Sequence, residues 1–304
     1  MARWAGRLSR AFRRRPQPLT TALRKVLYEP LEPRLLLSAD VSPFAHDLDP
    51  ARNDLTLRVD DAGAVPVLQL LTADALPGAG QVLLERPLDA VDGVVLRGTS
   101  GADRLTVDRN VPATLPVLFD DGTAGDGDVL TVGGDAPRWE IDGPDRGRVG
   151  GVAFRGVETL LGETDNEDTF VLRHEGSVSG VLDGNDGGFD TLVIDGRTGP
   201  GPFVYAASGP DSGTVDFGDA VVAFAGLEPV VNATPPANFV IDLSAGDDVA
   251  VLENDPGNPG FLRVRSLNAS FEEISFAPGA LLTLTIDGQG GTDEVTISET
   301  VDLS

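Results

Sequence analysis

A seven-residue unit recurs six times in this chain of 304 residues and restricts the folds open to it. Each copy has a small or polar residue, then an aspartate two positions later, then apolar residues two and four positions after that, as in Gly101-Ala-Asp103-Arg-Leu105-Thr-Val107. Apolar residues at every second position indicate a strand with one buried face. Glycine or asparagine permits the left-handed backbone of a tight corner, and the aspartate caps the turn. The six aspartates are Asp103, Asp128, Asp168, Asp190, Asp248 and Asp293.

The spacing of these aspartates favours a stack of similar strands. They lie 25, 40, 22, 58 and 45 residues apart; the short intervals suit one coil of a parallel β-helix and the longer ones roughly two. Val152–Glu158 is echoed by Val222–Glu228 at a spacing of 70, which agrees with degenerate repeats that pack on their neighbours. The body is therefore predicted to be all-β, as a parallel β-helix or β-solenoid. The alternative is a pair of β-sandwich domains divided near residues 232–237.

Composition restricts the class of protein further. Glycine (37) and proline (22) make up about one residue in five, which argues against a helix bundle, because helices need long runs free of both. The chain has no cysteine, which excludes disulfides, thiolate metal sites and thiol catalysis. No apolar run is long enough for a transmembrane helix, so none is predicted.

Charge divides the chain into two parts. Residues 1–40 carry nine basic and three acidic side chains, a net charge of +6, whereas the remaining 264 residues carry 14 basic and 45 acidic ones, a net charge of −31. This asymmetry indicates separate roles for a basic N-terminal segment (1–40), a linker (41–54) and a repetitive body (55–304). A body this acidic repels phosphate backbones, so no nucleic-acid partner is expected.

The basic segment is predicted to be partly helical, over about residues 18–28, or disordered. It ends in the string Leu31-Glu32-Pro33-Arg34-Leu35-Leu36-Leu37, followed by Ser38-Ala39. This string resembles the LEPR-XLL motif, a short N-terminal element of large, repetitive, secreted or surface proteins of bacteria. The resemblance covers about a dozen residues and implies export to the extracellular space or the cell surface.

The repeated units also resemble the calcium-binding nonapeptide of RTX-type exported proteins. Gly98, Gly101, Asp103 and Leu105 match four of its five fixed positions. In that family the nonapeptides run in tandem and share each calcium ion, whereas here single units stand 22 or more residues apart. Calcium takes six to eight oxygen ligands, more than one turn supplies. Two interpretations stay open: the six aspartates hold structural Ca²⁺ with neighbouring carboxylates such as Asp121, or they only cap turns.

No catalytic or cofactor-binding residue is assigned from the sequence. The chain's two histidines, His46 in the linker and His174 in the body, lie in no recognisable motif and are interpreted as surface residues. Glycosidases on β-helices use paired carboxylates, and aspartate-rich turns could hide such a pair. The body has one tryptophan, Trp139, and one tyrosine, Tyr205, so no aromatic platform for a sugar is predicted.

These observations lead to one functional hypothesis and two alternatives. The chain is interpreted as a monomeric part of an exported bacterial surface protein, not an enzyme, with a structural or adhesive stalk that contacts cell-surface or matrix components. The alternatives are a β-helical polysaccharide lyase or glycoside hydrolase, which three convergent carboxylates or an arginine–carboxylate pair in a groove would favour, and a calcium-responsive folding module. Glu299–Ser304 follows the last expected strand without a capping coil, so a truncated member of a longer protein is expected.

Overall fold

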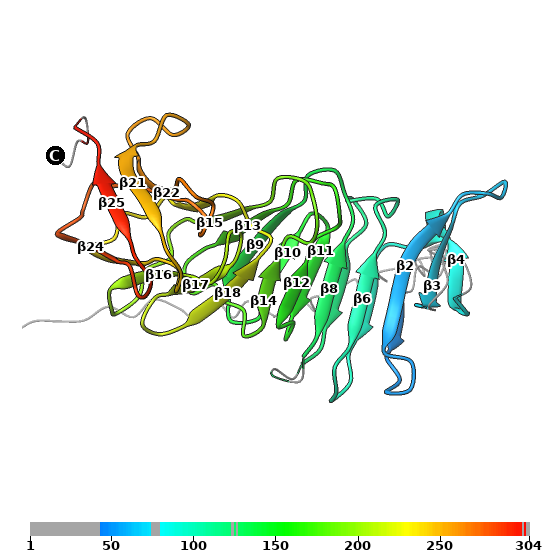
Figure 1. The fold of residues 1–304 in the computed structure, drawn as a ribbon. Helices are drawn as coiled ribbons and strands as arrows, with labels where there is room; N and C mark the ends of the chain where they lie inside the picture. Colours follow the sequence, from blue (N-terminus) through cyan, green and yellow to red (C-terminus); the bar gives the residue numbers. More distant parts are fainter. Residues whose placement is uncertain (1–42, 74–79, 123–124, 126, 300, 302–304) are drawn as a thin grey trace, which may run out of the picture. The chain divides into compact units, whose positions relative to one another are not determined.

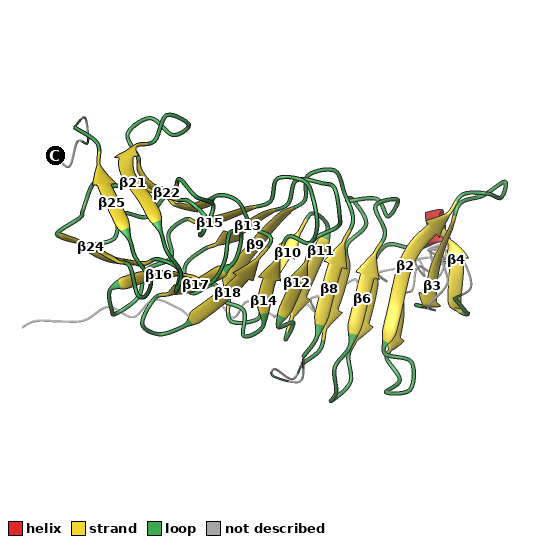
Figure 2. Ribbon diagram, viewed as in Figure 1, coloured by secondary structure: helices red, strands yellow, loops and turns green. Residues whose placement is uncertain are grey.

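The computed structural model describes residues 43–73, 80–122, 125, 127–299 and 301. All of them belong to one compact unit, and the string Leu31–Leu37 lies outside them with the rest of segment 1–40. The described residues are almost entirely β, which confirms the prediction of an all-β body (Figures 1 and 2). They include one 3₁₀ turn, η1 (Leu88–Ala90), and within them no helix has the length and hydropathy needed to cross a membrane.

The strands form two large sheets, and the chain passes repeatedly from one to the other. Sheet 1 contains β1 (Phe44–Asp47), β5 (Val94–Arg97), β7 (Val117–Asp120), β9 (Arg138–Gly143), β10 (Arg146–Val149), β11 (Val152–Arg155), β13 (Thr169–Leu172), β15 (Thr191–Ile194), β19 (Val230–Asn232), β21 (Val249–Asn254), β22 (Leu262–Ser266), β23 (Ile274–Phe276) and β25 (Glu294–Ile297). Sheet 2 contains β2 (Asp54–Asp60), β3 (Val67–Thr72), β4 (Val82–Pro87), β6 (Arg104–Val107), β8 (Val129–Val132), β12 (Thr159–Leu161), β14 (Val181–Asp183), β16 (Phe203–Ala207), β17 (Gly213–Asp216), β18 (Val221–Ala225), β20 (Asn238–Asp242) and β24 (Thr283–Asp287).

Parallel pairing joins successive passes of the chain through each sheet. Among the described strands, antiparallel pairing occurs only inside four three-stranded meanders, β2–β3–β4, β9–β10–β11, β16–β17–β18 and β21–β22–β23. After each meander, the next strand in the opposite sheet pairs with the strand that preceded the meander, as β12 pairs with β8. The following strand pairs with the first strand of the meander, as β13 pairs with β9. The alternation between sheets is consistent with the solenoid interpretation.

The meanders explain the long intervals between repeated units. Asp248 and Asp293 are 45 residues apart, yet β21 and β25, which follow them, pair directly. The expectation that this interval spans two coils is therefore wrong, because the additional residues form β22 and β23, the second and third strands of a meander. The echoed segments at Phe154 and Phe224 prove to be the third strands, β11 and β18, of meanders in opposite sheets. Strands on either side of residues 232–237 pair with each other in both sheets, as β19 with β23 and β16 with β20.

The inward side chains of neighbouring strands stack in rows. In sheet 2 the aligned row contains fully or almost fully buried residues, namely Leu55, Leu105, Leu130, Leu160, Leu182 and Phe224. Side chains from both sheets belong to one apolar cluster; Phe239 of β20, for example, meets Phe276 of β23 edge to face at 4.9 Å between ring centroids. Since one strand register aligns the apolar residues, it also aligns the acidic residues that stand two positions before them.

Candidate metal centre and neighbouring acidic sites

Acidic residues stand immediately before three neighbouring strands of sheet 2. Asp103, Asp128 and Glu158 precede β6, β8 and β12, and parallel pairing places them side by side. The backbone N–H of Asp103 donates to Asp128 Oδ1 at 2.7 Å, and that of Asp128 donates to Glu158 Oε2 at 2.8 Å. The carboxylates of Asp128 and Glu158 thus each accept a charge-assisted hydrogen bond from a backbone N–H of the preceding coil.

Sheet 1 repeats this arrangement with the remaining predicted aspartates. The backbone N–H of Asp168 donates to Asp190 Oδ1 at 2.6 Å, and that of Asp248 donates to Asp293 Oδ1 at 3.0 Å. Trp139 Nε1 also donates to Asp168 Oδ1, at 2.8 Å. The six aspartates therefore form three cross-strand pairs, and each pair links one unit of the repeat to the next.

Burial raises the pKa of some of these carboxylates. Asp168 and Asp190 are both buried. Burial is the main cause that raises the pKa of Asp190 to about 6, and it also raises the pKa of Asp168. The hydrogen bonds from backbone and indole N–H groups oppose these shifts. The pairs are therefore well bonded and still carry a cost of desolvation.

A third carboxylate joins one of the pairs. Asp121 follows β7 at the end of a strand of sheet 1 and meets Asp103 and Asp128 where the chain crosses to sheet 2. One carboxylate oxygen from each of the three lies within 4.8 Å of the other two, and all three residues are buried. Asp103 Oδ2 accepts from the backbone N–H of Thr99, whereas its buried Oδ1 has no hydrogen-bond partner among the described residues. We call these three residues the aspartate triad.

Gly98 provides the space in which the triad forms. A Cβ atom at this position would lie 2.0 Å from Asp121 Oδ1 and 2.9 Å from Asp103 Oδ2, closer than atoms can approach. Glycine at position 98 is thus needed for the room it leaves. At the corners before Asp190 and Asp293, by contrast, Gly188 (φ 97°) and Gly291 (φ 95°) supply the left-handed backbone expected from the repeat.

The donor set of the triad suits a hard divalent cation. It offers only carboxylate oxygens, the ligands that Ca²⁺ and Mg²⁺ prefer, and no nitrogen or sulfur for softer metals. Asp103 Oδ2 accepts a backbone N–H bond, which leaves Oδ1 of the same carboxylate for a ligand. Three clustered carboxylates would balance a charge of +2, and main-chain carbonyls or water would have to complete the coordination shell.

The sequence indicated Asp121 only as a neighbour, because the repeated unit does not contain it. The triad forms because β6 and β8, 25 residues apart in their aspartates, are adjacent in the sheet. Within the described residues, neither of the other two pairs has a third carboxylate at metal-binding distance. Of the six aspartates, Asp103 and Asp128 are thus the two that the described structure places in a geometric candidate for a metal site.

A second group of acidic residues surrounds an open hollow of about 540 Å³ beside β15, β19 and β23. Its lining includes Glu228, Glu272, Glu273 and Arg265. Burial, followed by the charges of Glu228 and Glu273, raises the pKa of Glu272 to about 8. We call this feature the acidic hollow; no sequence pattern indicated it, because its glutamates lie outside the repeated units.

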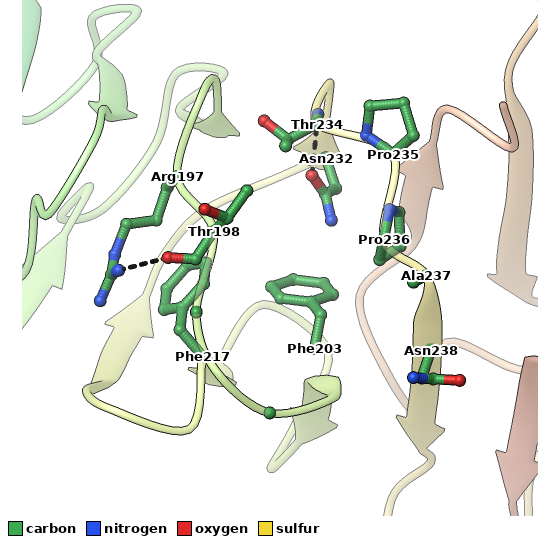
Figure 3. Close-up of a pocket in the computed structure, with 12 residues that line it drawn as sticks. Arg197, Thr198, Phe203, Phe217, Asn232, Thr234, Pro235, Pro236, Ala237 and Asn238 are labelled. Atoms are coloured by element: carbon green, nitrogen blue, oxygen red, sulfur yellow. Dashed lines mark hydrogen bonds between the residues drawn. The ribbon is translucent and has the colours of Figure 1, made fainter. Parts of the chain in front are cut away.

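A smaller cavity of about 250 Å³ lies beside Phe203 and Phe217 (Figure 3). Arg197 at its edge is almost fully buried, but its guanidinium is already engaged. It donates to the Thr198 carbonyl at 2.7 Å, pairs with Asp219 at 2.8 Å and stacks 4.5 Å from the centre of the Phe217 ring. These contacts give Arg197 a structural role in holding the loop.

No protein-family model, curated protein sequence or solved structure matches this chain.

Proposed function

We propose that this chain is part of an exported bacterial surface protein whose β body is a structural, adhesive stalk. In this proposal a divalent cation binds the aspartate triad and cross-links neighbouring strands, and Ca²⁺ is the cation that we favour. The Leu31–Leu37 string would serve as the export address, as its resemblance implies.

The continuity of both sheets is the observation that carries the proposal. Passes of the chain pair in parallel with one another along sheet 1 and sheet 2, and one apolar cluster lies between them. Each unit packs mainly on its neighbours, so such a body gains length by adding units without a change in its cross-section. An acidic exterior keeps such a body soluble and favours the uptake of cations.

The aspartate triad gives the cation a defined structural role. Asp121 belongs to the end of a sheet 1 strand, while Asp103 and Asp128 belong to the starts of two sheet 2 strands. A bound cation would therefore cross-link three segments of two consecutive coils and remove the repulsion among their carboxylates. This role also accommodates the calcium-responsive folding module that the sequence left as an alternative.

Thermal unfolding of the full chain tests the cation. With about 10 mM CaCl₂ and a Kd of about 10⁻⁴–10⁻³ M, as in extracellular modules, binding adds about 1.4 to 2.7 kcal/mol over the value in EDTA. Asp121→Asn removes one ligand charge with almost no change in shape, and Asp120→Asn on the same strand is the matched control. Calcium should raise the Tm of the wild type and of D120N by several degrees, but not that of D121N. An unchanged wild-type Tm, or an equal shift in D121N, contradicts the cation role.

Surface digestion of intact cells tests export. In the bacterium that makes the chain, external protease should remove the body of the wild type. Replacement of Leu35, Leu36 and Leu37 by alanine should leave the body protected inside the cell. Protection of the wild-type body would refute export, whatever the outcome of the calcium experiment.

The acidic hollow favours a second function, that of a carbohydrate-active β-helical enzyme. Its lining includes three carboxylates and an arginine, the residue types that favour such an enzyme. Glu272, held protonated, and Glu228 would act as the acid and base of glycoside cleavage. Release of new reducing ends from neutral and acidic oligosaccharides, and its loss in both Glu272→Gln and Glu228→Gln, is the result expected of an enzyme. Absence of products from the wild type removes this candidate.

A further inference from the structure

The acidic hollow is formed by segments that lie far apart in the sequence. Its walls come from the loop before β15, the β16–β17 turn, the residues before β19, and the β22–β23 connection. Segments far apart in the sequence therefore converge on one open space large enough for a compact ligand.

The negative charge of the hollow is only partly neutralised by arginines. Arg265 Nε donates to Glu253 Oε1 at 2.7 Å, and Arg263 lies 3.4 Å from Glu273 Oε2. Within the part of the chain that the structure describes, Glu228 and Glu272 form no ion pair. Glu228 is exposed at the rim, whereas Glu272 is only 8% exposed at the wall. A cation entering the hollow would therefore meet unpaired carboxyl groups.

An aromatic ring stands at the rim of the same hollow. Phe189 is 56% exposed, whereas Phe271, which also lines the hollow, is buried. Pro210 and Pro229 extend this apolar surface. An exposed aromatic face beside carboxylates attracts a cation through its quadrupole and also offers a flat surface to the C–H groups of a ring.

The surrounding strands do not offer an edge to an extended peptide. β15 pairs with β13 and β19, and β23 pairs with β19 and β22. Their main-chain groups are engaged on both sides, so strand addition, the usual mode of capture for an extended peptide, has no template here. Recognition by side chains favours a compact, ring-shaped ligand.

We propose that the acidic hollow binds an amino-sugar residue of a glycan, with its ring stacked on Phe189 and its ammonium group between Glu228 and Glu272. The positively charged ammonium group would provide the ion-pair partner that these two carboxyl groups do not have among the described residues. The hydroxyl groups of the ring would bond to the remaining polar lining, which includes Ser266. This inference needs neither export nor the bound cation, so its failure would leave the proposed function untouched.

Proton release gives the proposal a specific signature. Glu272 is largely protonated at pH 7, and the charged groups around it are Glu228, Glu273, Asp211 and the nearby arginines Arg263 and Arg265. An ammonium beside Glu272 would favour its ionised form, so binding should release a proton to the buffer. Calorimetry in buffers of different ionisation enthalpy measures this release directly.

Titration of the full chain with three probes tests the ligand class: glucosamine trimer, its N-acetylated form and galacturonic acid trimer. We expect saturable binding of the glucosamine trimer, weaker binding of the N-acetylated trimer and none of the acidic one. Phe189→Ala and Glu228→Gln should each weaken binding by about tenfold or more, or about 1.4 kcal/mol. Val221→Ala, equally exposed on β18, and Glu294→Gln on β25 are the matched controls and should bind as the wild type does.

Glu272→Gln should abolish the proton release. The proposal is overturned if the glucosamine trimer does not bind, if the acidic trimer binds as tightly, or if Phe189→Ala leaves the affinity unchanged. Trilysine provides the last comparison, because it carries ammonium groups without a sugar ring. Binding of trilysine as tight as that of the glucosamine trimer would identify a site for basic peptides and refute the glycan.

Discussion

Replacement of Glu272 by glutamine should make the protein more stable at neutral pH. Glu272 is almost fully buried just before β23, and its backbone carbonyl accepts a hydrogen bond from Tyr205 Oη at 2.7 Å. Burial is the first cause of its raised pKa, and the charges of Glu228 and Glu273 are the next. Glutamine has nearly the same shape and never ionises, so the variant keeps the packing and removes the cost of the buried charge.

The magnitude follows from the difference between the folded and unfolded states. The pKa of Glu272 is raised from 4.5 to about 8, so the folded state binds its proton more tightly than the unfolded state does. This group therefore imposes no cost below pH 4.5, and its cost grows as the pH rises towards 8 and then levels off. At 1.36 kcal/mol per pKa unit, the lost stability is about 3 kcal/mol at pH 7 and about 5 kcal/mol above pH 8.

Urea unfolding of the full chain at pH 5, 7 and 8.5 measures this effect. The stability difference between Glu272→Gln and the wild type should be small at pH 5 and should increase with pH. Comparison of the two chains isolates Glu272, since Asp190, whose pKa is also raised, to about 6, is present in both. Glu175→Gln, at an exposed glutamate, is the control and should track the wild type. A stability difference that does not change with pH would refute the reasoning.

Three further substitutions test the fold and the triad by urea unfolding, and the last of them is also tested by thermal unfolding with and without calcium. Leu105→Ala should cost about 2–5 kcal/mol, because it opens a cavity in a fully buried row, and Thr106→Ala on the same strand should cost much less. Trp139→Phe should cost about 1–3 kcal/mol, since it removes the indole donor to Asp168 while the ring can still stack on Phe170. Gly98→Ala should lower stability and also abolish the calcium-dependent rise in Tm, because its Cβ would displace Asp121; an alanine variant that keeps the full rise would contradict the placement of the triad.

The positions of these strands could be predicted from the sequence because each repeated unit contains the alternating apolar residues of one strand. Leu105 and Val107 alternate with outward residues, and both are buried as the alternation requires. The pairing partners could not be predicted in the same way, because sequence distance does not determine them. The aspartates before the paired strands β6 and β8 are 25 residues apart, whereas those before the paired strands β21 and β25 are 45 residues apart. The second interval is longer because it contains the additional strands of a meander.

The candidate sites were less predictable than the strands. Asp103 and Asp128 could be selected from their place in the unit, but Asp121 belongs to no unit and reaches the triad only through the crossing between sheets. The acidic hollow depends on Phe189 and on glutamates from two further segments, Glu228 before β19 and Glu272 and Glu273 before β23. Its residues share no pattern in the sequence, and only the folded chain brings them together.

The placement of the meanders affects how a chain of this kind can change in length. Each meander adds two strands to one sheet alone, or about 10 Å at a strand spacing of about 4.8 Å. The first and third meanders lie in sheet 2 and the second and fourth in sheet 1, so each surplus is cancelled by the next, and the described strands number 13 and 12. Loss of a single meander would leave one sheet overhanging the other, with an uncovered apolar face. We therefore expect related chains to gain or lose meanders in pairs, one from each sheet.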